Sequence, residues 1–176
     1  MPAQTLIFAT GNESRGDDAL GPLLLRELDS WLKKTEQGDK EKTDRFVQQF
    51  ELMEEFQLQI EHAMDIKDRK RVLFIDAGMD TPSPFHFYRL QSSDQAVLYS
   101  HALAPQALLK VYLQFYREPP PDAFVLCIKG DSFELGEPLS ANASANLALA
   151  LNFARQRLQE TESSDWDKAS LQSATR

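Results

Sequence analysis

The chain has 176 residues, and its 19 Lys and Arg against 27 Asp and Glu give a formal net charge of -8 at pH 7. This length is typical of one domain with a sizeable core, while the acidic charge argues against a nucleic-acid partner. A single cysteine, Cys127, excludes an internal disulfide and any site built from several cysteines. The sequence has no basic leader and no apolar run long enough to cross a membrane, so we expect a cytoplasmic protein without membrane contact.

Five segments predict β-strands. Residues 5–10, 72–75 and 123–128 are short, continuous apolar runs, as in strands that are covered on both faces of a parallel sheet. Residues 46–58 and 85–90 predict two further strands. Because helical stretches alternate with these strands, the sequence predicts a single three-layer α/β/α domain with a mostly parallel central sheet of about five strands.

Amphipathic stretches predict the helices between the strands. Pro22 and Pro105 lie in the first turns of two of them, and a short helix is expected over 60–66. Ser140 can cap a third helix, whose predicted buried face consists of small and aliphatic residues: Ala143, Leu147, Ala150, Leu151, Ala154 and Leu158.

Two polar segments are expected to lie outside the core. Residues 33–45 contain nine charged residues in thirteen, which predicts a solvated surface insertion within a domain spanning 1–160. Residues 161–176 predict a polar, flexible tail.

Candidate site residues follow the predicted strands, because ligands of open α/β sheets bind beyond the carboxyl ends of the strands. Asp17 and Asp18 follow the first strand, Asp76 ends the strand over 72–75, and His101 lies in a predicted loop ahead of a helix. An aspartate at the end of a buried strand is costly unless it is paired, hydrogen bonded or bound to a cation. Two carboxylates and an imidazole at one sheet edge are suitable ligands for a divalent transition metal.

Each of these residues also has a structural explanation. Asp18 can complement a helix dipole, Asp76 can cap a turn, and His101 can be an ordinary surface residue. We expect His62, His86 and Cys127 to be structural as well, as judged from their positions in a helical stretch and in strands.

The same acidic residues allow a second class of protein. With Lys129 at the end of a later strand, they resemble a phospho-accepting receiver domain that binds magnesium. The spacing argues against this alternative, because receivers place the acidic pair directly at the strand end.

Five short motifs in order resemble those of the hydrogenase maturation endopeptidases, over about residues 5–158. The first is Gly11-Asn12, four residues, Asp17-Asp18, two residues and Gly21. Asp76, in Ile-Asp-Ala, matches the second acidic position of that family, and His101, in Ser-His, matches its histidine. At the position of Asp18 the family often has glutamate. Residues 57–63 and 129–140 (KGDSFELGEPLS) are similar to the branch that serves NAD-reducing, multi-subunit hydrogenases.

The resemblance implies an endopeptidase that removes a C-terminal peptide from the nickel-loaded large-subunit precursor of a nickel-iron hydrogenase. Asp18, Asp76 and His101 would be the ligands that recognise the precursor's nickel, for which zinc or cadmium could substitute. The metal could activate water, or it could only dock the substrate while Asp17 or Asp76 acts as general base. A non-catalytic maturation factor that binds metal or precursor is the alternative. We expect the protein to act as a monomer.

Overall fold

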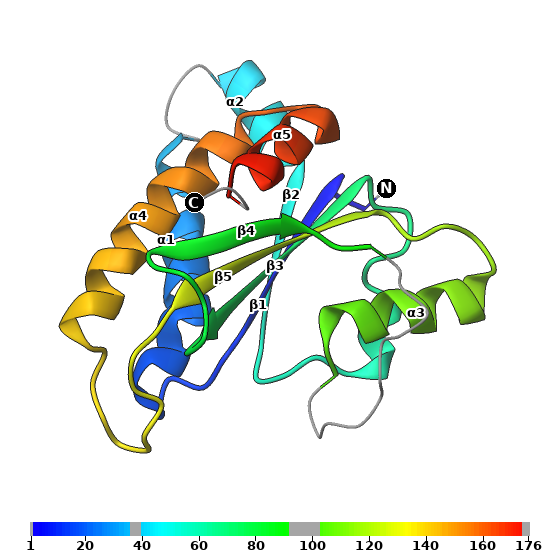
Figure 1. Ribbon diagram of the computed structural model, residues 1–176. Coiled ribbons are helices and arrows are strands. Elements are labelled where there is room, and N and C mark those ends of the chain that lie inside the picture. Colours follow the sequence, from blue (N-terminus) through cyan, green and yellow to red (C-terminus); the bar gives the residue numbers. More distant parts are fainter. Residues whose placement is uncertain (1, 36–39, 92–102, 174–176) are drawn as a thin grey trace.

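The structure is a computed structural model and describes residues 2–35, 40–91 and 103–173. Its five strands form one sheet in the order β2-β1-β3-β5-β4 (Figure 1). The first four of these strands run parallel, and β4 is antiparallel at the edge. The strands are β1 (Thr5–Thr10), β2 (Phe50–Glu55), β3 (Arg71–Gly78), β4 (Phe85–Arg89) and β5 (Asp122–Lys129).

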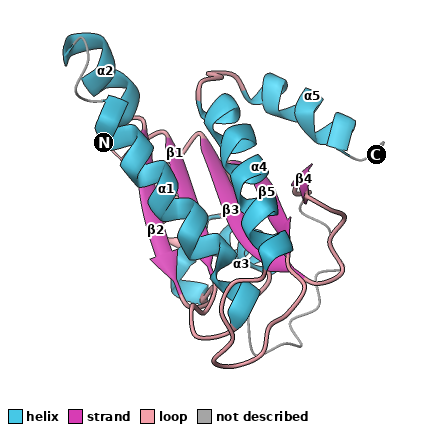
Figure 2. Ribbon diagram, turned by 90° about the vertical axis from the view of Figure 1, so that its left-hand side faces the viewer, coloured by secondary structure: helices cyan, strands magenta, loops and turns pink. Residues whose placement is uncertain are grey.

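Helices cover both faces of the sheet, which gives the predicted three layers. On one face lie α1 (Leu20–Thr35), α4 (Ala141–Leu158) and α5 (Ser163–Ser173). Figure 2 shows α1 and α4 in front of the strands. On the other face lie α3 (Pro105–Tyr116) and the short 3-10 helix η2 (Ile60–Ala63). None of the helices in the described ranges is long and apolar enough to span a membrane.

The continuous apolar runs of the strands supply both cores at once. Ile7 and Ile75 pack beneath α1 and α4, whereas their neighbours Phe8 and Phe74 pack beneath η2 and α3, and all four are buried. Successive side chains of a strand point to opposite faces, so a strand that is covered on both sides must be apolar at every position. This confirms the strands predicted from the three apolar runs.

The predicted helix starts are confirmed. Pro22 lies in the first turn of α1, and Pro105 is the first residue of α3. The Ser140 side chain accepts a hydrogen bond of 3.2 Å from the backbone N–H of Ala143 at the start of α4. The buried face of α4 also includes Asn146, which the apolar pattern did not predict and whose amide donates to the Lys129 carbonyl at 3.0 Å.

The charged segment 33–45, predicted as a solvated surface insertion, is helical in its described residues 33–35 and 40–45. Helix α1 continues to Thr35, and α2 (Lys40–Val47) forms a separate helix. Lys, Glu and Arg are good helix formers, and Phe46 at the end of α2 packs edge-on against Trp31 of α1 with ring centroids 6.0 Å apart. The strand predicted over 46–58 is correspondingly shorter.

The C-terminal segment is not a flexible tail over residues 163–173, which form α5. Trp166 is completely buried, and its ring contacts Phe87 of β4 and Phe124 of β5. Its indole N–H donates to the Arg157 carbonyl at 2.8 Å. The prediction failed because one buried tryptophan anchors a segment whose composition is otherwise polar.

Candidate functional site

The strand order creates a crevice between the ends of β1 and β3. After β1 the chain forms β2 on one side of β1, and it then crosses to form β3 on the other side. Open α/β sheets bind ligands where the strand order reverses in this way. A pocket of about 510 Å³ opens there, on the face covered by α3 and η2. The strand ends, the turn after β1 and the start of α3 line it, and Asp18 and Asp76 are among its residues.

Two glycines of the first motif allow the turn after β1 to pack against the strand ends. A Cβ atom at Gly21 would lie 2.3 Å from the Thr10 carbonyl oxygen and 3.2 Å from that of Ile75. At Gly11, which has a φ of +153°, it would lie 2.1 Å from the Asp18 carbonyl oxygen. Neither position can hold a larger residue without moving backbone. The close packing brings the 3-10 helix η1 (Gly16–Ala19) to the sheet edge.

Asp18 and Asp76 interact at this edge. The carboxylate of Asp18 accepts a hydrogen bond of 3.1 Å from the backbone N–H of Asn12, and that of Asp76 accepts one of 2.8 Å from its neighbour Ala77. Burial raises the pKa of both groups. The pKa of Asp76 rises to about 6, with a further contribution from the negative charge of Asp18.

This pair of carboxylates has the electrostatics of a cation site. The negative charge of Asp18 disfavours ionisation of Asp76, whereas the positive charge of Arg15 favours ionisation of Asp18. A bound cation would favour the ionised form of Asp76 in the same way. Within the described ranges, no three His, Cys, Asp or Glu side chains form a group that could hold a metal ion. The third predicted ligand, His101, lies outside the described residues. The structure therefore brings Asp18 and Asp76 together and does not place His101.

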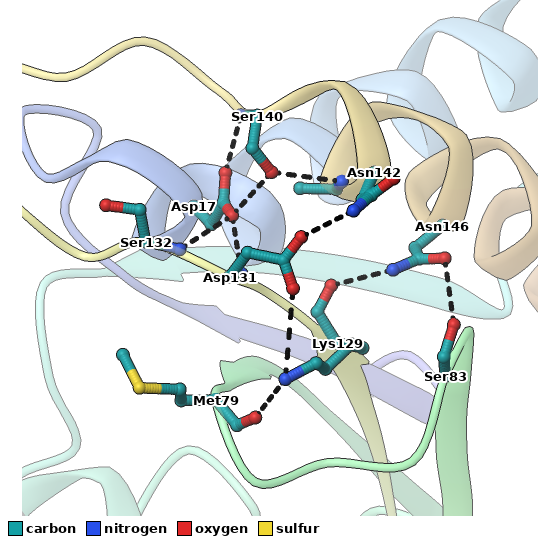
Figure 3. Close-up of polar contacts among 10 residues, drawn as sticks. Asp17, Met79, Ser83, Lys129, Asp131, Ser132, Ser140, Asn142 and Asn146 are labelled. Carbon is teal, nitrogen blue, oxygen red and sulfur yellow. Dashed lines mark hydrogen bonds and ion pairs between the residues drawn. The ribbon is translucent and has the colours of Figure 1, made fainter.

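Asp17 does not line the pocket. Its carboxylate is fully buried on the other side of η1, where it accepts hydrogen bonds from three backbone N–H groups and from the Ser140 hydroxyl (Figure 3). Burial by itself would raise the pKa of Asp17, but these hydrogen bonds outweigh it and hold the pKa below its usual value. The position gives Asp17 no access to a substrate, which disagrees with its prediction as a general base.

The other two histidines have structural surroundings, as predicted. The imidazole of His62 is largely buried, accepts a hydrogen bond of 2.9 Å from the backbone N–H of Gln59 and packs edge-on against Phe8. His86 lies on the edge strand β4, where its ring contacts Tyr88. Neither histidine lines the pocket.

Cys127 was predicted to be inert core, but it lines the pocket together with Tyr88. The Cα atom of Cys127 is paired with that of Asp76 on the neighbouring strand. Its thiol lies 3.0 Å from the Thr81 hydroxyl. Residues that are paired on neighbouring parallel strands point to the same face of the sheet. An alignment of the predicted strands that pairs residue 76 with residue 127 could therefore have identified Cys127 as a pocket residue.

The fold is similar to those of several solved structures. HycI from Thermococcus kodakarensis, a NiFe hydrogenase maturation protease, superimposes with a TM-score of 0.62 at 17% sequence identity, over 90% of this chain and 94% of that chain. The hydrogenase maturating endopeptidase HybD from E. coli gives a TM-score of 0.62 at 19% identity, over 90% and 93% of the two chains. HybD from Thermococcus kodakarensis gives 0.61 at 20% identity, over 88% and 99%.

No family model and no curated protein matches the sequence of the chain. The structural likeness covers nearly the whole of both chains in each pair. It confirms, at the level of the fold, the resemblance carried by the sequence motifs. The chain therefore has the fold of the hydrogenase maturation proteases.

Proposed function

We propose that this protein is an endopeptidase that removes a C-terminal peptide from the nickel-loaded large-subunit precursor of a nickel-iron hydrogenase. The observation that carries the proposal is the pair Asp18 and Asp76, which share a pocket at the point where the strand order reverses. The fold is that of proteins that are hydrogenase maturation proteases. The segments 57–63 and 129–140 favour a precursor from the NAD-reducing, multi-subunit hydrogenases.

In this proposal, nickel arrives with the substrate and binds to Asp18, Asp76 and His101. Two carboxylates and an imidazole suit nickel, zinc and cadmium. With its pKa raised to about 6, Asp76 is largely ionised at neutral pH and can bind a cation there, whereas below about pH 6 it must first release a proton. The pocket is also lined by the apolar residues Phe56, Leu58 and Leu103, of which Phe56 is well exposed, and a peptide segment of the precursor can pack there.

The proton transfers of peptide hydrolysis require a group that titrates near the working pH. Asp76 fits this requirement while it is not itself bound to the metal, because in the metal-free site burial and the neighbouring Asp18 raise its pKa to about 6. We assign the role of general base to Asp76, and not to Asp17, for the case in which the metal only docks the precursor. In the other case, the nickel itself activates the attacking water.

The receiver-domain alternative loses its support. A receiver needs both members of its acidic pair and the lysine around one magnesium site. Here Asp17 is directed into the segment 131–140, and the Lys129 ammonium donates to the Met79 carbonyl (Figure 3). Neither side chain is among those that line the pocket with Asp76.

Incubation of the protein with its nickel-loaded precursor tests the proposal. We expect intact mass measurements to show the loss of one C-terminal peptide, with none lost in Asp18→Asn, Asp76→Asn or His101→Ala. His86→Ala is the matched control, because His86 lies on an edge strand outside the pocket, and it should cleave normally. If the wild type binds metal but does not cleave the precursor, the protein is a non-catalytic maturation factor and not a protease. If the protein instead gained the mass of one phosphate on incubation with acetyl phosphate, the receiver-domain alternative would be supported.

A further inference from the structure

The segment 131–140, here called the strap, lies across the turn that carries Asp18. The backbone N–H of Gly136 donates to the Ser14 carbonyl at 2.8 Å, and that of Asp17 donates to the Ser132 carbonyl at 2.8 Å. The Arg15 guanidinium donates to the Phe133 carbonyl at 3.1 Å. The strap is thus hydrogen bonded along the length of the turn.

One carboxylate closes both ends of the strap. At its start, Asp17 accepts from the backbone N–H groups of Asp131 at 2.7 Å and Ser132 at 3.1 Å. At its end, Asp17 accepts from Ser140, through the backbone N–H at 2.7 Å and the hydroxyl at 2.8 Å. Because buried polar groups without partners are costly, removal of this carboxylate would leave several donors unsatisfied at both ends.

The strap is itself fixed to the rest of the fold (Figure 3). The Asn142 side chain, in the first turn of α4, donates to the Asp131 carboxylate at 2.9 Å. Asn146, one turn further on, donates to the Lys129 carbonyl at 3.0 Å. Asp17 therefore joins the turn after β1 to a segment anchored on β5 and α4.

The contact between strap and turn is tight enough to need glycine on both sides. A Cβ atom at Gly16, which has a φ of +51°, would lie 2.7 Å from the Ser132 carbonyl oxygen. A Cβ atom at Gly130 would lie 2.8 Å from that of Asp17. These distances leave no room for the turn to shift towards the strap, so the direction of the Asp17 side chain is fixed.

Asp17 and Asp18 are consecutive residues of the single 3-10 turn η1. With three residues per turn, neighbouring side chains point about 120° apart. Because Asp17 is held in the strap, Asp18 must face the pocket, where it meets the N–H of Asn12 at 3.1 Å. We propose that Asp17 is a positioning residue, which fixes the direction of Asp18 by clamping the strap to the turn; the role of Asp18 as a ligand rests on the proposed function.

The Asn12 amide reports on the position of Asp18 without any metal. Hydrogen exchange of this amide, followed by NMR, should be at least about tenfold faster in Asp17→Asn than in the wild type, relative to the amide of Phe8 in β1. Asp122→Asn is the matched control, since Asp122 pairs with Arg89 at the start of β5, and it should leave the ratio unchanged. An unchanged ratio in Asp17→Asn would overturn the inference, whereas an overall loss of stability would speed both amides.

A second variant covers the case in which Asp17→Asn does not fold. Ser140→Ala keeps the carboxylate and removes one of its four hydrogen bonds, together with the cap on the Ala143 N–H at the start of α4. The Asn12 ratio should rise by a smaller factor, because loss of the cap by itself does not touch the Asn12 amide. Glu137→Gln, which changes only the strap contact with the Ser132 hydroxyl, is its control and should not change the ratio. Equal ratios in these two variants would contradict the inference.

Calorimetric titration with Ni²⁺ connects the inference to the proposed function. If Asp18 is a ligand, Asp17→Asn should weaken nickel binding at least about tenfold, measured well below its melting temperature, while Asp122→Asn should bind like the wild type. Unchanged affinity in Asp17→Asn would count against the positioning role. If the wild type does not bind Ni²⁺, the metal site of the proposed function is contradicted. The exchange rate of the Asn12 amide would still test the positioning role of Asp17.

Discussion

Asp76 on β3 and Cys127 on β5 are paired in register, and both side chains line the same pocket. Burial raises the pKa of the Cys127 thiol, and the negative charge of Asp76 raises it further, although the hydrogen bond with Thr81 acts in the opposite direction. The thiol is therefore held in its protonated, weakly nucleophilic form beside the proposed metal site.

This arrangement predicts slow alkylation of Cys127. At pH 7.5, iodoacetamide should react with the native protein about tenfold more slowly than with the denatured chain, because only the thiolate is nucleophilic. Asp76→Asn should react faster than the wild type, since it removes the nearby negative charge. Mass spectrometry at timed intervals measures both rates. Equal rates in the wild type and Asp76→Asn would show that Asp76 does not influence the thiol.

Asp76→Asn should stabilise the metal-free protein at neutral pH. An aspartate whose pKa is raised to about 6 in the folded state binds its proton more tightly there than in the unfolded chain. Its contribution to stability is therefore fully present below about pH 4 and is lost as the pH rises through 6. The shift from 3.8 to about 6 corresponds to on the order of 3 kcal/mol at pH 7.

Thermal melts at pH 4.5 and 7.5 measure this effect, since most of the loss of stability falls between these pH values. The melting temperature of the wild type should fall between these pH values by more than that of Asp76→Asn. Asp122→Asn, which changes a carboxylate in an ion pair with Arg89, controls for the general loss of one negative charge. The same pH dependence in wild type and Asp76→Asn would contradict the raised pKa.

Metal binding should weaken in acid. Because a carboxylate ligand must lose its proton, the affinity for Ni²⁺ should fall about tenfold for each pH unit below about 6, where Asp76 becomes protonated. Asp18, whose pKa is also raised by burial, steepens the dependence. Calorimetric titrations between pH 5 and 8 test this, and an affinity that stays constant down to pH 5 would exclude Asp76 as a ligand.

Gly21→Ala should destabilise the protein by about 3 kcal/mol, because the new methyl group would overlap the Thr10 carbonyl oxygen at 2.3 Å. Gly136→Ala is the control. Gly136 has a φ of +82° but no atom within 4 Å of an added Cβ, so this variant should lose only about 1 kcal/mol from backbone strain. Urea titrations compare the two, and equal losses would mean that contact with the strand end is unimportant.

Trp166→Ala should cost about 3 to 5 kcal/mol, as for other fully buried tryptophans. Leu171→Ala on the same helix should change stability by less than about 0.5 kcal/mol, since Leu171 is 73% exposed. Chemical denaturation measures both variants. A loss below 1 kcal/mol for Trp166→Ala would indicate that α5 is not firmly docked.

The sequence predicted those features that depend on local residue patterns. Continuous apolar runs identified β1, β3 and β5, and Pro105 and Ser140 identified the starts of α3 and α4. The pairing of Asp18 with Asp76 could also be predicted, because the ends of parallel strands meet at one edge. The position of His101 stays a prediction.

What the sequence could not show depends on contacts between distant residues. Asp17 and Asp18 cannot be told apart by local sequence pattern. The packing of residues 131–140 against η1 gives Asp17 a structural role, whereas Asp18 lines the pocket. Trp166 stands alone in a polar segment, so no periodicity reveals that it enters the core formed by Phe87 and Phe124. Such residues have long-range partners that local patterns do not encode.

The docking of α5 also bears on self-processing. Arg71, the first residue of β3, lies over the Trp166 ring at 4.6 Å, whereas Asp76 is five residues further along the same strand. Five steps of a strand span roughly 16 Å, and α5 packs on the opposite face of the sheet from the pocket. A protein proposed to cut peptides from the C-termini of others thus keeps α5 out of reach of its pocket for as long as Trp166 remains in the core.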